Sequence, residues 1–199
     1  MLKASCNNYG ILKASKTIKN GGVIIFPTDT VYGIGGDPYN NEVVKRIYKI
    51  KSRDKNKSFP ILIDSKDTAA KIADFDKYSE RLAEKFWPGP VTIVLAVTDM
   101  KLKKSLNLDK KIALRIPNNN CTLQLLKKCK FLIGTSANIS GQESFTDPIQ
   151  CYQNITDVDL LLDGGILNGK PSTIIEIVNN EIKIHRNGSI TKKEIRDIF

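Results

Sequence analysis

Histidine and long apolar runs are the scarcest features of this sequence. Only His185 is a histidine among 199 residues, so a zinc site or catalytic dyad built from several imidazoles is excluded. No run of eighteen apolar residues is present, and residues 1–8 are polar where a signal peptide would carry its apolar segment. We therefore expect a cytoplasmic protein without membrane contact.

Cysteine is also scarce, and its spacing matches no common site. The four cysteines form no CxxC pair; they are Cys6, Cys121, Cys129 and Cys151. On one helix, Cys121 and Cys129 would lie roughly 12 Å apart. We therefore expect neither a metal site nor a disulfide framework.

Positive charge is in excess. The chain has 31 Lys and Arg against 21 Asp and Glu, a formal net charge of +10. Such a surface attracts polyanions, including nucleotides and RNA. A lysine-rich protein that binds no polyanion would carry the same charge. The net charge alone therefore does not distinguish a polyanion-binding protein from a merely lysine-rich one, and sequence motifs are needed.

Apolar runs alternate with helical patterns from end to end, which predicts a single α/β domain over residues 1–199. The stripe from Ile11 to Ile18 predicts a helix that ends at Gly21-Gly22, followed by a strand over 23–26. Asn40 is expected to cap a helix over 41–50. Further strands are expected at 59–63, 91–97, 112–116 and 131–133, with helices around Ala69, Leu82 and Leu125.

The C-terminal part predicts antiparallel pairing. Strands over 173–178 and 181–185 flank Asn179-Asn180, two residues that tolerate positive φ and suit a tight hairpin. Thr191 and Glu194 form a capping box that opens a short last helix. The sheet is therefore expected to be mixed.

Three common active-site signatures are incomplete. Residues 164–170 resemble a P-loop, but Pro171 replaces the metal-binding Ser or Thr. Residues 33–36 begin a dinucleotide fingerprint, but Pro38 stands where its third glycine belongs. Residues 134–138 resemble a serine-hydrolase elbow without its final glycine.

Four separated segments carry a specific resemblance. They read FPTDTVYG (26–33), KSR (51–53), WPGPVT (87–92) and SAN (136–138), and ALRIP (113–117) and PSTI (171–174) agree with them. In this order, over residues 8–190, the chain resembles the YrdC-like threonylcarbamoyl-adenylate synthase family in its short, single-domain form. The resemblance implies an open twisted sheet of parallel and antiparallel strands, flanking helices and a large basic concave cavity.

The reaction implied by the resemblance joins L-threonine and bicarbonate into a carbamate. A carbamate oxygen then attacks the α-phosphorus of ATP, releasing pyrophosphate and threonylcarbamoyl-AMP for threonylcarbamoyl-adenosine in tRNA. No protein nucleophile is required, because cations and hydrogen-bond donors suffice to gather the anions and stabilise the transition state. The resemblance also implies Mg²⁺ carried with the nucleotide and a partner transferase that modifies tRNA.

The KxR pair, Lys51 and Arg53, is implied to be catalytic and to hold the triphosphate. Both side chains can face one cavity if the helix ends at this point. Alternatively, both are solvated cations at a helix C-terminus. As exposed cavity cations they are expected to tolerate exchange for Ala without loss of the fold. The residues implied to bind ATP are Lys51, Arg53, Thr92, Ser136, Asn138 and Arg186.

The residues implied to bind threonine are Thr28, Tyr32, Arg115 and Ser172. Arg115 is the most informative, because it lies in an otherwise apolar strand and needs an anionic partner. Threonine's carboxylate and a buried salt bridge are the two candidates. Thr28 could instead be an ordinary turn residue.

Two segments depart from the family pattern. Arg-Pro-Gly becomes Arg186-Asn187-Gly188, and the Pro-Leu after the basic loop becomes Ser58-Phe59.

Two other functions stay open: an RNA-binding maturation factor without chemistry, and a paralogue with another small-molecule substrate. The chain lacks an aromatic RNP motif, and its KxR and SxN motifs are intact, which disfavours both. Weak binding of tRNA by the basic surface is compatible with each.

Overall fold

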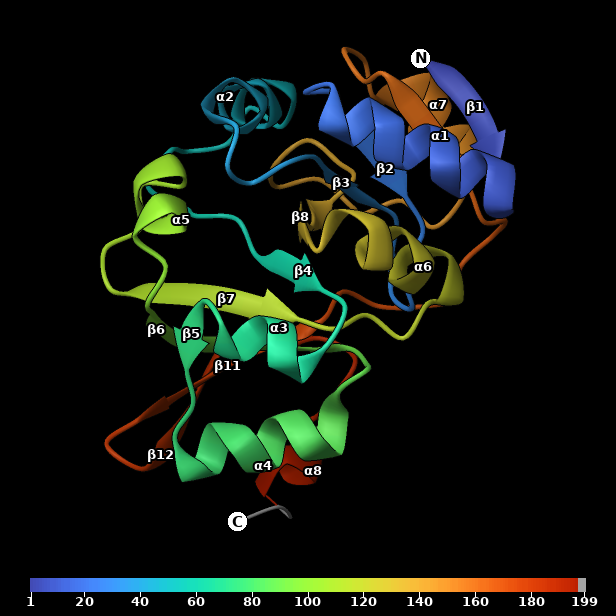
Figure 1. The fold of residues 1–199 in the computed structure, drawn as a ribbon. Helices are drawn as coiled ribbons and strands as arrows, with labels where there is room; N and C mark the ends of the chain where they lie inside the picture. Colours follow the sequence, from blue (N-terminus) through green and yellow to red (C-terminus); the bar gives the residue numbers. More distant parts are fainter. Residues whose placement is uncertain (197–199) are drawn as a thin grey trace.

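The computed structural model describes residues 1–196, which form two mixed sheets flanked by helices (Figure 1). Sheet A has the order β1–β10–β2–β3–β9. Its strands are β1 (Leu2–Ser5), β10 (Leu160–Asp163), β2 (Ile24–Phe26), β3 (Gly33–Gly35) and β9 (Thr135–Ser136). β10 runs parallel to both β1 and β2, whereas β3 is antiparallel to β2 and β9.

Sheet B has the order β12–β11–β6–β7–β4–β8, and β5 also pairs with β6. Its strands are β12 (Glu181–Arg186), β11 (Thr173–Val178), β6 (Val91–Val97), β7 (Lys111–Arg115), β4 (Ile61–Ile63), β8 (Phe131–Ile133) and β5 (Ala73–Asp74). Parallel pairs (β11–β6, β4–β7) alternate with antiparallel ones. The predicted mixed pairing is confirmed, but the strands divide between two sheets.

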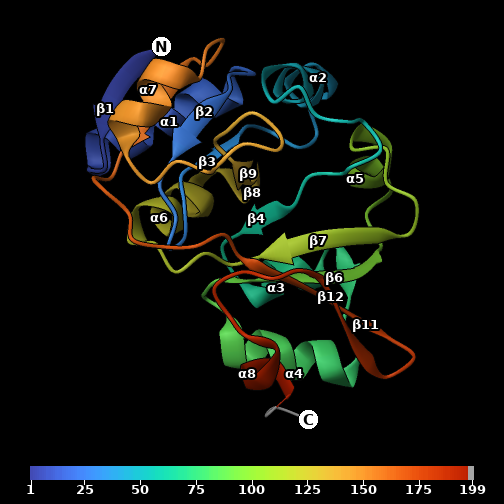
Figure 2. The same cartoon turned by 180° about the vertical axis from the view of Figure 1, so that it is seen from behind.

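The helices lie on the outer faces of the sheets. They are α1 (Asn8–Lys19), α2 (Asn41–Ile50), α3 (Lys66–Ala70), α4 (Lys77–Phe86), α5 (Met100–Ser105), α6 (Asn120–Cys129), α7 (Pro148–Asn154) and α8 (Lys192–Arg196). α1 packs on α6; α1 also contacts β1, β10 and β2 of sheet A, whereas α6 contacts β4 and β8 of sheet B. The apolar side chains of both helices belong to one buried cluster. α4 and α8 lie on the side of sheet B that faces away from sheet A, as both views show (Figure 2).

The chain passes from one sheet to the other at Gly134, between β8 and β9. A Cβ at this position would lie 2.3 Å from the Leu62 side chain of β4, so only glycine allows the backbone to approach so closely. This crossing places Ser136 opposite Gly33 of β3 in sheet A, two residues after Gly134.

Most predicted elements are confirmed, with small shifts of their ends. Asn40 caps α2 by accepting hydrogen bonds from two backbone N–H groups of the first turn. Asn179 and Asn180 have φ values of 51° and 62° in the β11–β12 hairpin. Thr191 and Glu194 form the predicted capping box, although the chain beyond residue 196 lies outside the described residues.

The elements not predicted from the sequence are β1, β3, β10, α5 and α7, along with the two-residue strands β5 and β9. β1 is an edge strand with three exposed residues, so it lacks a buried alternating pattern. Within residues 1–196, no helix is long and apolar enough to cross a membrane.

The expectation of no disulfide is wrong. Cys6, just after β1, is bonded to Cys121 in the first turn of α6, with the Cα atoms 5.7 Å apart. The two residues are separated by 115 positions. Spacing could therefore not reveal the pair, which exists because α1 and α6 pack together.

Candidate active site

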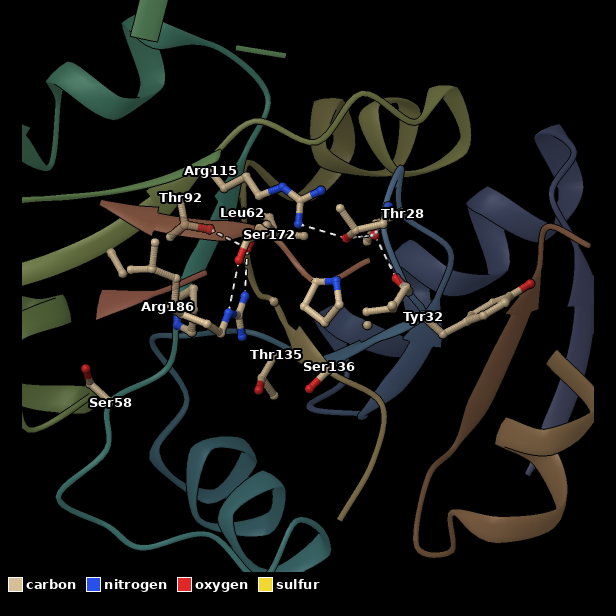
Figure 3. A pocket seen from close by; sticks show the side chains of 18 of the residues that line it. Thr28, Tyr32, Ser58, Leu62, Thr92, Arg115, Thr135, Ser136, Ser172 and Arg186 are labelled. Atoms are coloured by element: carbon tan, nitrogen blue, oxygen red, sulfur yellow. Dashed lines mark hydrogen bonds between the residues drawn. The ribbon is translucent and has the colours of Figure 1, made fainter. Parts of the chain in front are cut away.

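A cavity of about 240 Å³ lies between sheet A and sheet B (Figure 3). Strands β2, β3 and β9 supply one wall, and β6, β7 and β11 supply the other. The charged residues that line it are Arg53, Arg115 and Arg186; of residues 1–196, no Asp, Glu, Lys or His contributes to the lining. Such a lining favours anionic ligands.

Eight of the ten predicted site residues line this cavity. They are Thr28, Tyr32, Arg53, Thr92, Arg115, Ser136, Ser172 and Arg186. The other two, Lys51 and Asn138, are buried behind it. The residues predicted from separate segments therefore lie together, as the resemblance implies.

Arg115 is at the end of β7 and is only 6% exposed. Its Nε donates to Gly89 O at 3.0 Å, Nη1 donates to Thr30 Oγ1 at 3.1 Å, and Nη2 donates to Asp29 Oδ1 at 2.5 Å. Burial lowers the pKa of Arg115, while the charge and hydrogen bond of Asp29 act to raise it. A buried salt bridge, one of the two candidates for this arginine, is therefore present.

Thr28 belongs to a short hydrogen-bond chain that continues from Arg115. Its hydroxyl lies 2.9 Å from Thr30 Oγ1 and donates to Val31 O at 2.6 Å. Thr28 is thus a turn residue and also part of the cavity wall. The same turn leaves Asp29 Oδ2 as the one buried side-chain N or O atom in residues 1–196 without a hydrogen-bond partner.

Ser172 contacts two other predicted site residues, Thr92 and Arg186. Its hydroxyl lies 2.9 Å from Thr92 Oγ1 and accepts from Arg186 Nη2 at 2.8 Å. Arg186 Nε also donates to Ser172 O at 3.0 Å. Burial lowers the pKa of Arg186, and the nearby charges of Arg115 and Arg53 lower it further.

Arg53 lines the cavity and is supported by the loop that follows it. Its Nε and Nη2 donate to the carbonyl oxygens of Lys57 and Ser58, and its guanidinium lies 5.3 Å from the Phe59 ring centroid. Phe59 is buried against Tyr48, with the ring centroids 4.2 Å apart. The Ser-Phe departure from the family pattern is therefore accommodated.

Lys51 does not share the exposure of Arg53. It caps the C-terminus of α2, and Ser52 then adopts a left-handed φ of 47°, so the two basic side chains diverge. Lys51 is 1% exposed, and its Nζ donates to Ser136 O (2.5 Å), Asn138 O (2.8 Å) and Asn138 Oδ1 (3.0 Å). The expectation that both are exposed cavity cations is wrong for Lys51.

The Ser136–Asn138 loop is held together from within. Ser136 Oγ donates to Asn138 Oδ1 at 2.6 Å, and Asn138 Nδ2 donates to Gln142 O at 2.5 Å. Ser136 lines the cavity, whereas Asn138 supports the loop from behind it. Burial, and then the charge of Arg53, lower the pKa of Lys51 to about 7.

Tyr32 lines the cavity, but its hydroxyl points away from it (Figure 3). The hydroxyl donates to Gly165 O at 2.8 Å and accepts from Gly164 N at 3.0 Å. Burial raises the pKa of Tyr32, so the phenol stays protonated. Its polar group therefore anchors a neighbouring loop.

Asp29, Thr30 and Gly89 were not predicted as partners of Arg115. All three lie in quoted motif segments, so the signal was present, but only the fold shows that they meet one guanidinium. Gly188, the glycine of the Arg-Asn-Gly segment, is required because a Cβ there would lie 2.2 Å from Pro171 O.

The Sua5/YciO/YrdC family model, described as "Telomere recombination", matches residues 16–188. The chain belongs to this family. Structures of Sua5/YciO/YrdC proteins share its fold: the crystal structure of Pyrococcus abyssi Sua5 complexed with L-threonine superposes with a TM-score of 0.92 at 28% identity. That match covers 99% of this chain and 60% of the P. abyssi chain.

Sequence relatives in the Sua5/YciO/YrdC family agree. One from Methanocaldococcus jannaschii is 35% identical over 181 residues, covering 88% of this chain and 84% of that protein. A threonylcarbamoyl-AMP synthase from Pseudomonas fluorescens is 30% identical, covering 88% of this chain and 97% of that enzyme. The threonine complex is a property of the P. abyssi protein.

Proposed function

We propose that this chain condenses L-threonine, bicarbonate and ATP into threonylcarbamoyl-AMP and pyrophosphate, and is thus a nucleotidyltransferase. The observation that carries the proposal is the convergence of Arg53, Arg115 and Arg186 on one cavity whose other polar lining is hydroxyl groups. The reactants are anions or zwitterions that repel one another. Fixed cations and donors bring them together at no cost in reorganisation during the reaction.

In this proposal the cavity has two parts. Arg115 and Thr28 are joined by hydrogen bonds through Thr30, and we assign this side to threonine. Arg53, with the Ser136 loop, would face the triphosphate, because an arginine fork matches phosphate oxygens. Ser172 lies between the two parts.

Arg186 and Thr92 both contact Ser172, and we assign them to the nucleotide. Lys51 and Asn138 have a supporting role in this proposal: they hold the Ser136 loop in place. The threonine carboxylate would share or replace Asp29 as the partner of Arg115. Neither assignment needs a protein nucleophile.

The lining offers hydroxyl groups and no carboxylate among the described residues, which suits Mg²⁺ that arrives already bound to triphosphate oxygens. The magnesium is therefore part of the substrate complex in this proposal. The labile adenylate would pass to a tRNA-modifying transferase, and a cytoplasmic location follows from that role. Direct binding of RNA by the basic surface is not required.

The test is an assay with ATP, L-threonine and ¹⁴C-bicarbonate. We expect pyrophosphate and a labelled threonylcarbamoyl nucleotide, both dependent on threonine. Arg53→Ala should lower turnover at least a hundredfold, because a positioned cation that stabilises the transition state contributes roughly 3 kcal/mol. Arg81→Ala is the matched control, because Arg81 is exposed on α4 and does not line the cavity.

Two results would contradict the proposal. Pyrophosphate release that is independent of threonine would indicate another acceptor and favour a paralogue. RNA retention without any product would favour the non-catalytic RNA-binding alternative.

A further inference from the structure

The Cys6–Cys121 disulfide joins two structures that support the same stretch of cavity wall. Cys6 follows β1, and its backbone N–H donates to Asp163 O, at the end of β10, at 2.9 Å. Cys121 lies in the first turn of α6. The bond therefore ties the end of β10 to the start of α6.

Segment 27–32, which includes the cavity-lining Thr28, is anchored at both of its ends to these two structures. At one end, Pro27 O accepts a hydrogen bond from the buried hydroxyl of Thr122, next to Cys121. At the other end, the Tyr32 hydroxyl is held by Gly164 and Gly165, directly after β10. If the two supports move relative to one another, segment 27–32 must distort.

We propose that Cys6–Cys121 is a redox-sensitive bond that tunes the affinity of the cavity for threonine. With the bond formed, segment 27–32 is held in its binding conformation; with the bond reduced, part of the threonine binding energy is used to order it. The proposal rests on the proposed function for the identity of the ligand. The disulfide itself is independent of that identity.

The chemistry is a two-electron exchange with a small disulfide such as oxidised glutathione. A thiolate of Cys6 or Cys121 attacks the glutathione disulfide and forms a mixed disulfide, releasing one glutathione thiol. The second protein thiolate then displaces the other glutathione, so two protons and two electrons leave the protein. Both cysteines are partly exposed, which allows this access. Disulfides of cytosolic proteins are commonly conditional in this way.

The first measurement is of the bond alone. After equilibration in oxidised or reduced glutathione, unreacted thiols are alkylated and located by mass spectrometry. We expect Cys6 and Cys121 to be protected only in the oxidised sample. Because the bond closes a separation of 115 residues, its reduction should lower the Tm by roughly 10 °C.

The second measurement is threonine binding by calorimetry in the two redox states. We expect reduction to weaken binding about two- to fivefold, the cost of ordering one or two side chains. Cys6→Ser and Cys121→Ser should each match the reduced wild type in both buffers. Cys129→Ser is the control, because Cys129 is free of the disulfide and should keep the redox response.

The outcomes separate the two proposals. Equal threonine affinity in the two states, or alkylation of both cysteines in the oxidised sample, would overturn the redox proposal and leave the synthase intact. Absence of threonine binding in both states would refute the synthase and this tuning together, while the alkylation pattern still reports whether the bond forms.

Discussion

Exchange of Lys51 for Met separates a supporting role of the KxR lysine from direct contact with phosphate. Methionine keeps most of the apolar stem of Lys51 but removes an ammonium that donates to three oxygens of the Ser136–Asn138 loop. Ser136 O and Asn138 Oδ1 each keep another donor, from Asn138 N and Ser136 Oγ. Among residues 1–196, Asn138 O has no hydrogen-bond donor other than Lys51.

The expected loss of stability follows from these contacts. One buried acceptor without a partner costs about 1–3 kcal/mol, and two weakened acceptors add about 1 kcal/mol. Removal of a buried cation with a lowered pKa offsets part of this. We expect a net loss of about 2–3 kcal/mol, which in a chain of this size lowers Tm by roughly 5–10 °C.

The pH dependence supplies a second signature of Lys51. Because its pKa is about 7 in the folded protein and 10.5 unfolded, the unfolded state binds more protons between these values. This group therefore makes the free energy of unfolding rise as pH increases from about 7 to about 10. Lys51→Met should remove that rise, by up to a few kcal/mol.

Urea unfolding at several pH values, beside nucleotide binding, is the assay. Arg53→Ala is the matched variant: its donors go to carbonyl oxygens at an exposed loop, so we expect it to lose ATP binding with less than about 1 kcal/mol of stability. If Lys51→Met keeps the wild-type Tm and pH profile while losing ATP binding, its ammonium faces the nucleotide and our reasoning is refuted.

Two further predictions concern buried carboxylates. Asp29→Ala leaves Arg115 buried without its carboxylate, so chemical unfolding should show a loss of about 3–5 kcal/mol, whereas Asp29→Asn, which keeps an acceptor, should lose less. Burial acts to raise the pKa of Glu176, but hydrogen bonds from Lys111 and His185 outweigh it and lower the pKa. Its stabilisation is thus present above about pH 4.5 and lost as pH falls through the folded pKa; a wild-type acid profile in Glu176→Gln would contradict this.

The site was more predictable than its internal contacts. Arg115 could be singled out because a cation in an apolar strand demands an anion, and the structure supplies Asp29. Lys51 and Arg53 looked equivalent because their spacing does not reveal the backbone conformation of Ser52. Its left-handed φ turns the Lys51 side chain inward and leaves Arg53 at the cavity. The Cys6–Cys121 pair was invisible for a related reason, since helix packing alone brings the two together.

Local interactions could be predicted from the amino-acid sequence alone. The caps at Asn40 and Thr191, the hairpin at Asn179-Asn180 and the apolar periodicity of the longer elements follow from interactions within a few residues. The division of strands between two sheets, the burial of Lys51 and the disulfide were decided by tertiary structure. Each depends on contacts between segments far apart in the chain, whose free energies arise only when the sheets and helices pack.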